Sequence, residues 1–148
     1  TAVVFAFLSY VDYSKMEAAV QYRTGEEVAM PMQIDNEWGK VFVSNEVIAV
    51  LAGSAALDCY GLVGMASRKQ LKDGIAELLG RENLSRGVEV RTEPDGVHIE
   101  LHIIVSYGTK ISEVAHNVQA KVKYVLNDVV GLKADFVDIV VQGVRIAR

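Results

Sequence analysis

The stretch Ile103-Ile-Val-Ser-Tyr-Gly-Thr-Lys-Ile-Ser-Glu-Val-Ala-His-Asn-Val-Gln-Ala-Lys-Val-Lys-Tyr124 gives the clearest indication of the fold. It begins as an apolar strand, turns at Gly108 and continues as an amphipathic helix. We expect Thr109 to cap this helix and Gly131 to end it. The apolar residues of the helix recur three and four positions apart, as in a helix that covers a sheet: Ile111, Val114, Ala115, Val118, Val122, Val125, Leu126 and Val129.

A long strand, Val97–Ser106, precedes this helix. Its residues alternate between apolar and polar, and alternate residues of a strand point to opposite faces of a sheet. The core face carries Val97, Ile99, Leu101, Ile103 and Val105, and the other face carries His98, Glu100 and His102. The turn Glu93–Gly96 joins this strand to an earlier one, Gly87–Thr92, because proline presets one φ and glycine accepts a positive one.

Four further elements complete the expected order. A strand, Gly39–Val43, leads into a helix at 45–58, which is rich in small residues, so we expect a neighbouring element to approach Gly53 closely. Lys69–Leu79 has the apolar stripe of a second helix, and Asp135–Ile146 reads as the last strand, with Val137, Ile139 and Val141 facing inward.

The order β-α-α-β-β-α-β predicts an α+β fold, with a mainly antiparallel sheet and helices packed on one face. Ser44 is the expected N-cap of the first helix, because its hydroxyl can accept a hydrogen bond from a free amide in the first turn.

Composition sets limits on the class of protein. The chain has 148 residues, 51% of them hydrophobic and 23% charged, which suits one globular domain. Its net charge of −4 gives no evidence of a strongly cationic face, so a nucleic acid partner is not expected. The single cysteine, Cys59, cannot form an internal disulfide, which suits a reducing cytoplasm. The apolar run Ala2–Leu8 is far shorter than the roughly 20 residues of a membrane span.

Residues 1–38 differ from the rest of the sequence, and 39–146 form the expected compact domain. The stretch Thr1–Tyr13 has the composition of a strand. Met30 and Met32 are each a plausible native start, so the preceding segment reads as an extension, a leader or a non-native piece. An ordinary edge strand packed on the domain is an equally good interpretation.

His98 and His102 are the candidate metal ligands, since two histidines on one strand face can bind zinc. Polar residues on a solvent-facing strand explain them better, because His116 sits on a helix and no cysteine clusters nearby. We therefore predict no specific zinc site at His98 and His102. The sequence contains no set of residues that suggests a catalytic, cofactor-binding or metal site.

The pair Gly61 and Gly64 has the GxxG spacing of the loop with which KH domains clamp RNA. Arg68, Lys69 and Lys72 follow shortly after, but Leu62 and Val63 leave the loop itself without a cation. We favour a turn between two packed helices and expect weak or no RNA binding. Likewise, Cys59 reads as a small residue at a helix end rather than as a nucleophile.

Four stretches of the chain resemble one family. They are Gly39-Lys-Val-Phe-Val-Ser-Asn-Glu-Val-Ile-Ala-Val-Leu-Ala-Gly53, Tyr60-Gly-Leu-Val-Gly-Met65, Val105-Ser-Tyr-Gly-Thr-Lys-Ile-Ser-Glu-Val-Ala115 and Val140-Val-Gln-Gly-Val144. Together they resemble the alkaline shock protein family of Gram-positive bacteria, and its YloU-like branch most closely, over about residues 39–146.

This resemblance implies a non-enzymatic cytoplasmic protein of the envelope stress response and of cell-envelope homeostasis, sometimes held at the membrane by an integral-membrane partner. It implies no catalytic residues. The expected role is therefore a structural or interaction protein that acts by self-association and partner binding. We expect a homo-oligomer in which sheet edges or the uncovered sheet face form the contact, with Ala2–Leu8 pairing in it or beside it. The alternative is a KH-like RNA-binding module.

Overall fold

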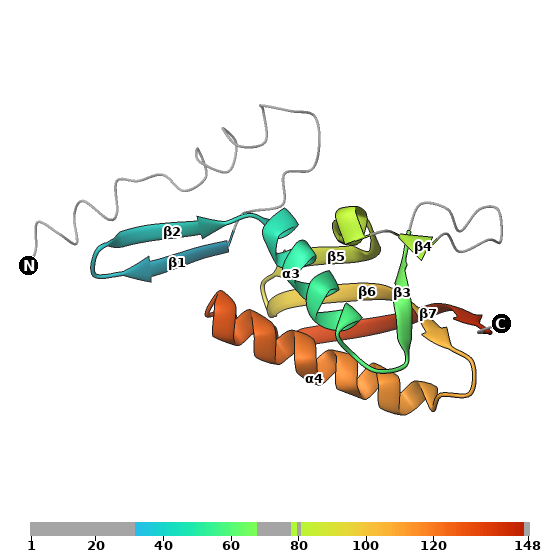
Figure 1. Ribbon diagram of the computed structural model, residues 1–148. Coiled ribbons are helices and arrows are strands. Elements are labelled where there is room, and N and C mark those ends of the chain that lie inside the picture. Colours follow the sequence, from blue (N-terminus) through green and yellow to red (C-terminus); the bar gives the residue numbers. More distant parts are fainter. Residues whose placement is uncertain (1–31, 68–77, 80, 147–148) are drawn as a thin grey trace, which may run out of the picture.

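A computed structural model describes residues 32–67, 78–79 and 81–146 (Figure 1). The strand β6 (Gly96–Ser106) is the centre of a five-stranded sheet. Along one edge of β6 lie β5 (Val88–Glu93) and then β3 (Leu62–Ala66), both antiparallel to it. The short strand β4 (Leu78–Leu79) extends the sheet beyond β3.

The strand β7 (Phe136–Arg145) lies along the other edge of β6 and runs parallel to it. The helix α4 (Ile111–Val129) connects the two, and parallel neighbours need such a crossover. The predicted α+β fold with a mainly antiparallel sheet is confirmed.

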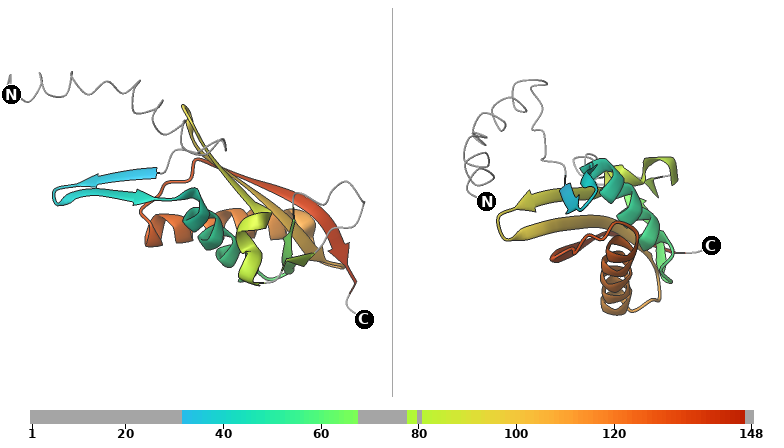
Figure 2. Two further views of the ribbon diagram at one scale, coloured as in Figure 1. Left: turned by 90° about the horizontal axis from the view of Figure 1, so that it is seen from above. Right: turned by 90° about the vertical axis from the view of Figure 1, so that its left-hand side faces the viewer.

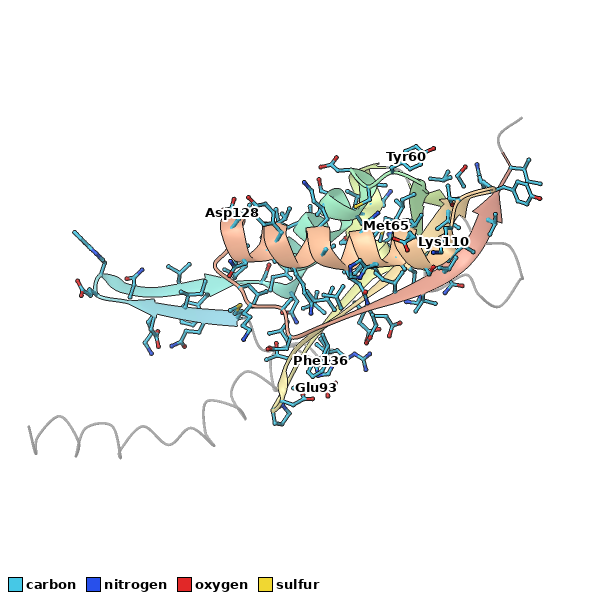
Figure 3. All side chains as sticks on the ribbon, turned by 90° about the horizontal axis from the view of Figure 1, so that it is seen from below. Tyr60, Met65, Glu93, Lys110, Asp128 and Phe136 are labelled. Carbon is cyan, nitrogen blue, oxygen red and sulfur yellow. The ribbon has the colours of Figure 1, made fainter. Side chains whose placement is uncertain are left out.

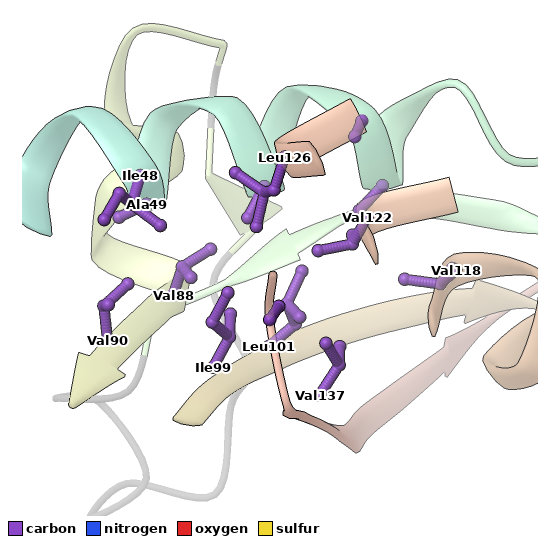
Figure 4. Packing of buried hydrophobic residues seen from close by; sticks show 14 of the residues in the cluster. Ile48, Ala49, Val88, Val90, Ile99, Leu101, Val118, Val122, Leu126 and Val137 are labelled. Atoms are coloured by element: carbon purple, nitrogen blue, oxygen red, sulfur yellow. The ribbon is translucent and has the colours of Figure 1, made fainter. Parts of the chain in front are cut away.

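The helices α3 (Asn45–Leu57) and α4 lie on the same face of the sheet, as Figure 2 shows. Apolar side chains of both helices meet the apolar face of β6 there (Figure 4). Ile99, Leu101 and Ile103 are fully buried in this layer, as the alternation predicted. The buried residues that α4 contributes to this layer are Val114, Val118, Val122 and Leu126.

The small residues of α3 permit a close approach by η2 (Arg81–Gly87), a 3-10 element. A Cβ atom added to Gly53 would lie 3.0 Å from the Cβ atom of Leu84. The expected close contact at Gly53 is therefore confirmed. At the start of α3, the Ser44 hydroxyl accepts a hydrogen bond from the Val47 amide at 3.4 Å, so the predicted cap is confirmed too.

A hairpin of β1 (Met32–Asn36) and β2 (Gly39–Val43) forms a separate two-stranded sheet that projects from the body of the domain (Figure 1). Met32 and Val43, at its base, pack against the core. The division predicted between residues 38 and 39 falls in the turn of this hairpin. It stays a prediction, and Ala2–Leu8 lies outside the described residues.

Three local predictions were wrong. The Thr109 hydroxyl donates to the carbonyl of Ser106 at 2.7 Å, and Lys110 occupies the N-cap of α4 without a side-chain hydrogen bond. Gly64 lies inside β3, opposite Ile104, instead of in a loop between helices. Leu78–Leu79 are strand rather than the end of a helix, while most of the predicted helix Lys69–Leu79 lies outside the described residues.

Candidate interaction surface

The sheet face turned away from α3 and α4, here called the far face, carries the polar residues of β6. The registers also place on it Arg91 of β5, opposite His98, and Asp138 of β7, opposite Glu100. The alternation therefore predicted correctly which residues of β6 point away from the helices. Their surroundings differ from those expected.

His102 is buried, with 4% of its surface exposed, so the prediction of a solvent-facing residue was wrong. The side-chain amide of Gln142 donates to Nδ1 of His102 at 2.7 Å. The Nε2 atom lies 2.8 Å from Oε1 of Glu100, but the oxygen is off the N–H direction and Nε2 has no hydrogen-bond partner among the described residues. Gln142 comes from a strand 40 residues later, and nothing in the local pattern of β6 indicated it.

His98 has different partners, at the turn between β5 and β6. Its Nε2 atom lies 2.9 Å from Oδ1 of Asp95 and 3.9 Å from Oε2 of Glu93. Its ring stacks on Phe136 of β7, with the ring centroids 4.3 Å apart (Figure 3 labels Phe136 and Glu93). The sequence pattern predicted the turn but not the roles of Glu93 and Asp95. A histidine that closely follows a turn with two carboxylates is the signal that could have indicated them.

Glu93, Asp95 and His98 each offer one metal-ligating atom, and these atoms lie within 4.8 Å of one another. Both carboxylates are exposed, and their contacts with the His98 ring account for the cluster without an ion. His98 and His102 thus engage separate sets of side chains. The absence of a zinc site at this pair stays a prediction.

The surroundings of Cys59 and Gly61 explain both residues by their places in the fold. Burial raises the pKa of the Cys59 thiol, while Lys121 lowers it and Asp58 raises it further. The thiol lies 3.7 Å from the carbonyl oxygen of Ala55, at the end of α3. A raised pKa disfavours the thiolate that nucleophilic chemistry needs. Gly61 has φ +88°, and a Cβ there would lie 2.7 Å from Cγ2 of Val114, so this glycine serves a tight turn against α4.

Large apolar side chains are exposed on the projecting hairpin. Trp38 at its tip is 96% exposed and Phe42 is 61% exposed. Val47 and Val50 of α3, which follows the hairpin directly, are also exposed. Aromatic residues are enriched at protein–protein contact sites, so the exposed Trp38 and Phe42 make the hairpin a candidate interaction surface.

No helix in the described part of the chain has the length and apolar character needed to cross a membrane.

The fold and its exposed side chains define a small α+β domain with candidate interaction surfaces. The chain belongs to the alkaline shock protein 23 family, described by its cell envelope-related function, whose family model matches residues 33–146. This match begins within β1, so it includes nearly the whole hairpin as well as the domain behind it.

The chain is 60% identical over 119 residues to YloU of Bacillus subtilis (strain 168), an uncharacterized protein; the match covers 80% of this chain and 99% of the relative. It is 38% identical over 117 residues to the uncharacterized protein Spy1614 of Streptococcus pyogenes serotype M6, covering 79% of this chain and 97% of the relative. The chain is 32% identical over 111 residues to the uncharacterized protein YqhY of Bacillus subtilis (strain 168), and the match covers 75% of this chain and 81% of the relative. No solved structure matches the chain.

Proposed function

We propose that this protein is a non-enzymatic structural and interaction protein of the envelope stress response and of cell-envelope homeostasis. It acts in the cytoplasm by associating with itself and by binding a membrane-anchored protein. The family's cell envelope-related function supports the setting. The observation that carries the interaction role is the projecting hairpin with its exposed Trp38 and Phe42.

The hairpin is suited to a partner because its side chains Trp38 and Phe42 are exposed and it forms a sheet of its own among the described residues. An isolated two-stranded sheet is marginally stable in water, so a contact that covers it stabilises it. Trp and other aromatic side chains dominate the binding energy of many interfaces, because they bury a large rigid surface. The partner would therefore present an apolar groove or face to the hairpin.

Membrane vesicles from the native cell test the partner. We expect the purified chain to sediment with intact vesicles, and not with protease-treated vesicles or with liposomes made from the extracted lipids. Trp38→Ala combined with Phe42→Ala should reduce the sedimented fraction several-fold. Tyr124→Ala, which removes an exposed aromatic side chain from α4, is the matched control. Equal binding to liposomes would contradict a protein partner.

Light scattering tests self-association, on the full chain and on a version that starts at Met32. We expect both to exceed the monomer mass at micromolar concentrations. A strictly monomeric mass for both would remove self-association from the proposal.

A further inference from the structure

We propose that two copies of this chain associate through β7, antiparallel to one another, with Asp138 of each copy opposite Arg145 of the other. The inference rests on the proposed self-association and names its surface. Five features of β7 support it. They are its open edge, the uncharged residues 139–144, the charges of Asp138 and Arg145, which have no ion-pair partner in the described part of the chain, its register with β6, and the directions of its backbone groups.

The first feature is the open edge. β7 is ten residues long and pairs only with β6 among the described strands. Side chains of α4 cover the start of this free edge by hydrogen bonds to backbone carbonyls. Gln119 donates to the Val137 carbonyl at 2.8 Å, and Lys123 donates to the Asp135 carbonyl, just before β7, at 3.3 Å. Within the described residues, no side chain does so from Asp138 onward (Figure 3 shows β7 beside α4).

The other long edge of the sheet is protected. β5 alternates charged residues along its length, Glu89, Arg91 and Glu93, and the Asn45 amide of α3 donates to the Val90 carbonyl at 3.3 Å. Charged side chains and covering groups are the usual means by which proteins prevent edge strands from pairing. In the described part of the chain, β7 has neither kind of protection between Asp138 and Arg145, because residues 139–144 are uncharged and no side-chain hydrogen bond covers this part of its free edge.

The two charges that bound this stretch complement each other. Asp138 and Arg145 are exposed, and neither has an ion-pair partner among the described residues. In a twofold antiparallel arrangement, each aspartate meets the arginine of the other copy, so two equivalent ion pairs form. Like charges directly opposite each other would instead destabilise the pairing.

Both residues also lie on the same face of the sheet, which such pairing requires. Residues seven apart normally point to opposite faces of a strand. The irregularity in β7 between Val141 and Gly143 shifts the register, so that Asp138 lies opposite Glu100 and Arg145 opposite Ser106, both on the far face. The same shift brings Ile139 and Val144 to one face, the helix side, opposite Leu101 and Val105.

The backbone directions fit this register. The Val137 carbonyl accepts a hydrogen bond from Gln119, so the backbone N–H and C=O groups of Val137 point away from β6. Because these directions alternate along a strand, the backbone groups of Ile139 also point away from β6. The Arg145 carbonyl accepts a hydrogen bond from the Tyr107 amide and so points toward β6. The backbone groups of the preceding residue, Val144, therefore point away from β6. In the proposed register, Ile139 of one copy lies opposite Val144 of the other. These two residues can therefore exchange two backbone hydrogen bonds.

Sedimentation equilibrium on the full chain tests the inference through charge reversal. Asp138→Arg and Arg145→Asp should each weaken the self-association constant about tenfold, because each creates two like-charge contacts. The double variant restores both pairs with reversed polarity and should return to within about threefold of the wild type. Asp128→Arg, on the exposed surface of α4, controls for net charge.

A second pair of variants tests the backbone contact. Val144→Pro removes an N–H group that points away from β6, so the fold keeps its pairing with β6 and the dimer loses two hydrogen bonds. Val144→Ala keeps the N–H group and should remain associated. A monomeric wild type would overturn both the proposed self-association and this inference. An associated wild type with unchanged charge-reversal and proline variants would overturn the β7 contact alone.

Discussion

The two faces of β6 are buried by different means. On the helix side, α3 and α4 cover Ile99, Leu101 and Ile103 with apolar side chains, and shape alone determines the fit. On the far face, His102 is buried by contacts with Gln142 and Glu100. Hydrophobic contact is non-directional, whereas a buried polar group costs free energy unless it finds a partner at the right position. The helix side should therefore carry more of the stability, and the far face more of the specificity in strand pairing.

The largest expected effect is on the helix side. Leu101→Ala removes a fully buried side chain at the centre of the sheet, so it leaves a cavity between β6 and the helices. We expect the free energy of unfolding to fall by about 2–5 kcal/mol. Urea denaturation measures this loss. A loss below about 1 kcal/mol would mean that the helix layer collapses onto the sheet and that the core is looser than its burial indicates.

The packing between α3 and η2 gives the next largest effect. Gly53→Leu places a side chain where even a Cβ atom would lie 3.0 Å from the Cβ atom of Leu84. Overpacking of this kind costs about 1–3 kcal/mol, which thermal unfolding would detect. Ser54→Leu, at the exposed neighbouring position, is the matched control and should leave the stability nearly unchanged. Equal stability of both variants would place η2 further from α3.

The far face should respond in a way that the helix side cannot. Gln142→Leu leaves Nδ1 of buried His102 without its partner and should cost about 1–3 kcal/mol. Adding His102→Leu removes the orphaned group, so the double variant should recover much of the loss. Denaturation of the two single variants and the double variant forms a complete cycle. If the losses simply add, the two side chains do not depend on each other.

Sequence patterns predicted the helix side well, because apolar periodicity reports local geometry. The alternation of β6 and the stripe of α4 each lie within one continuous segment, and the alternation and the Ser44 cap were confirmed. The stripe was confirmed for Val114, Val118, Val122 and Leu126, but it was wrong for Ile111 and Val129, which are exposed at the two ends of α4. Even there, the prediction that Thr109 caps α4 was wrong. Its hydroxyl donates a hydrogen bond to the carbonyl of Ser106 and does not accept one from the helix.

The far face was harder to predict because its partners are distant in sequence. His102 reads as a surface residue in the pattern of β6, and only the pairing with β7 brings Gln142 to it. Ile104 is buried on the same face between Gly64 and Gly143, which come from two different strands. β3 itself was missed because its two glycines read as turn residues, although tertiary pairing with β6 makes this segment a strand.

The smallest expected effect is at the exposed margin of the far face. Arg91 lies 3.4 Å from Glu100 and 3.6 Å from Glu89, and about half of its side chain is exposed. Solvent screens such pairs, so Arg91→Ala should cost about 0.2–1 kcal/mol, and less at high salt. Denaturation at low and high ionic strength measures both quantities. A salt-independent loss above about 2 kcal/mol would contradict this expectation. It would mean that Arg91 holds Glu100 against His102, and that the polar contacts of the far face extend from the exposed margin of β5 to the buried centre of the sheet.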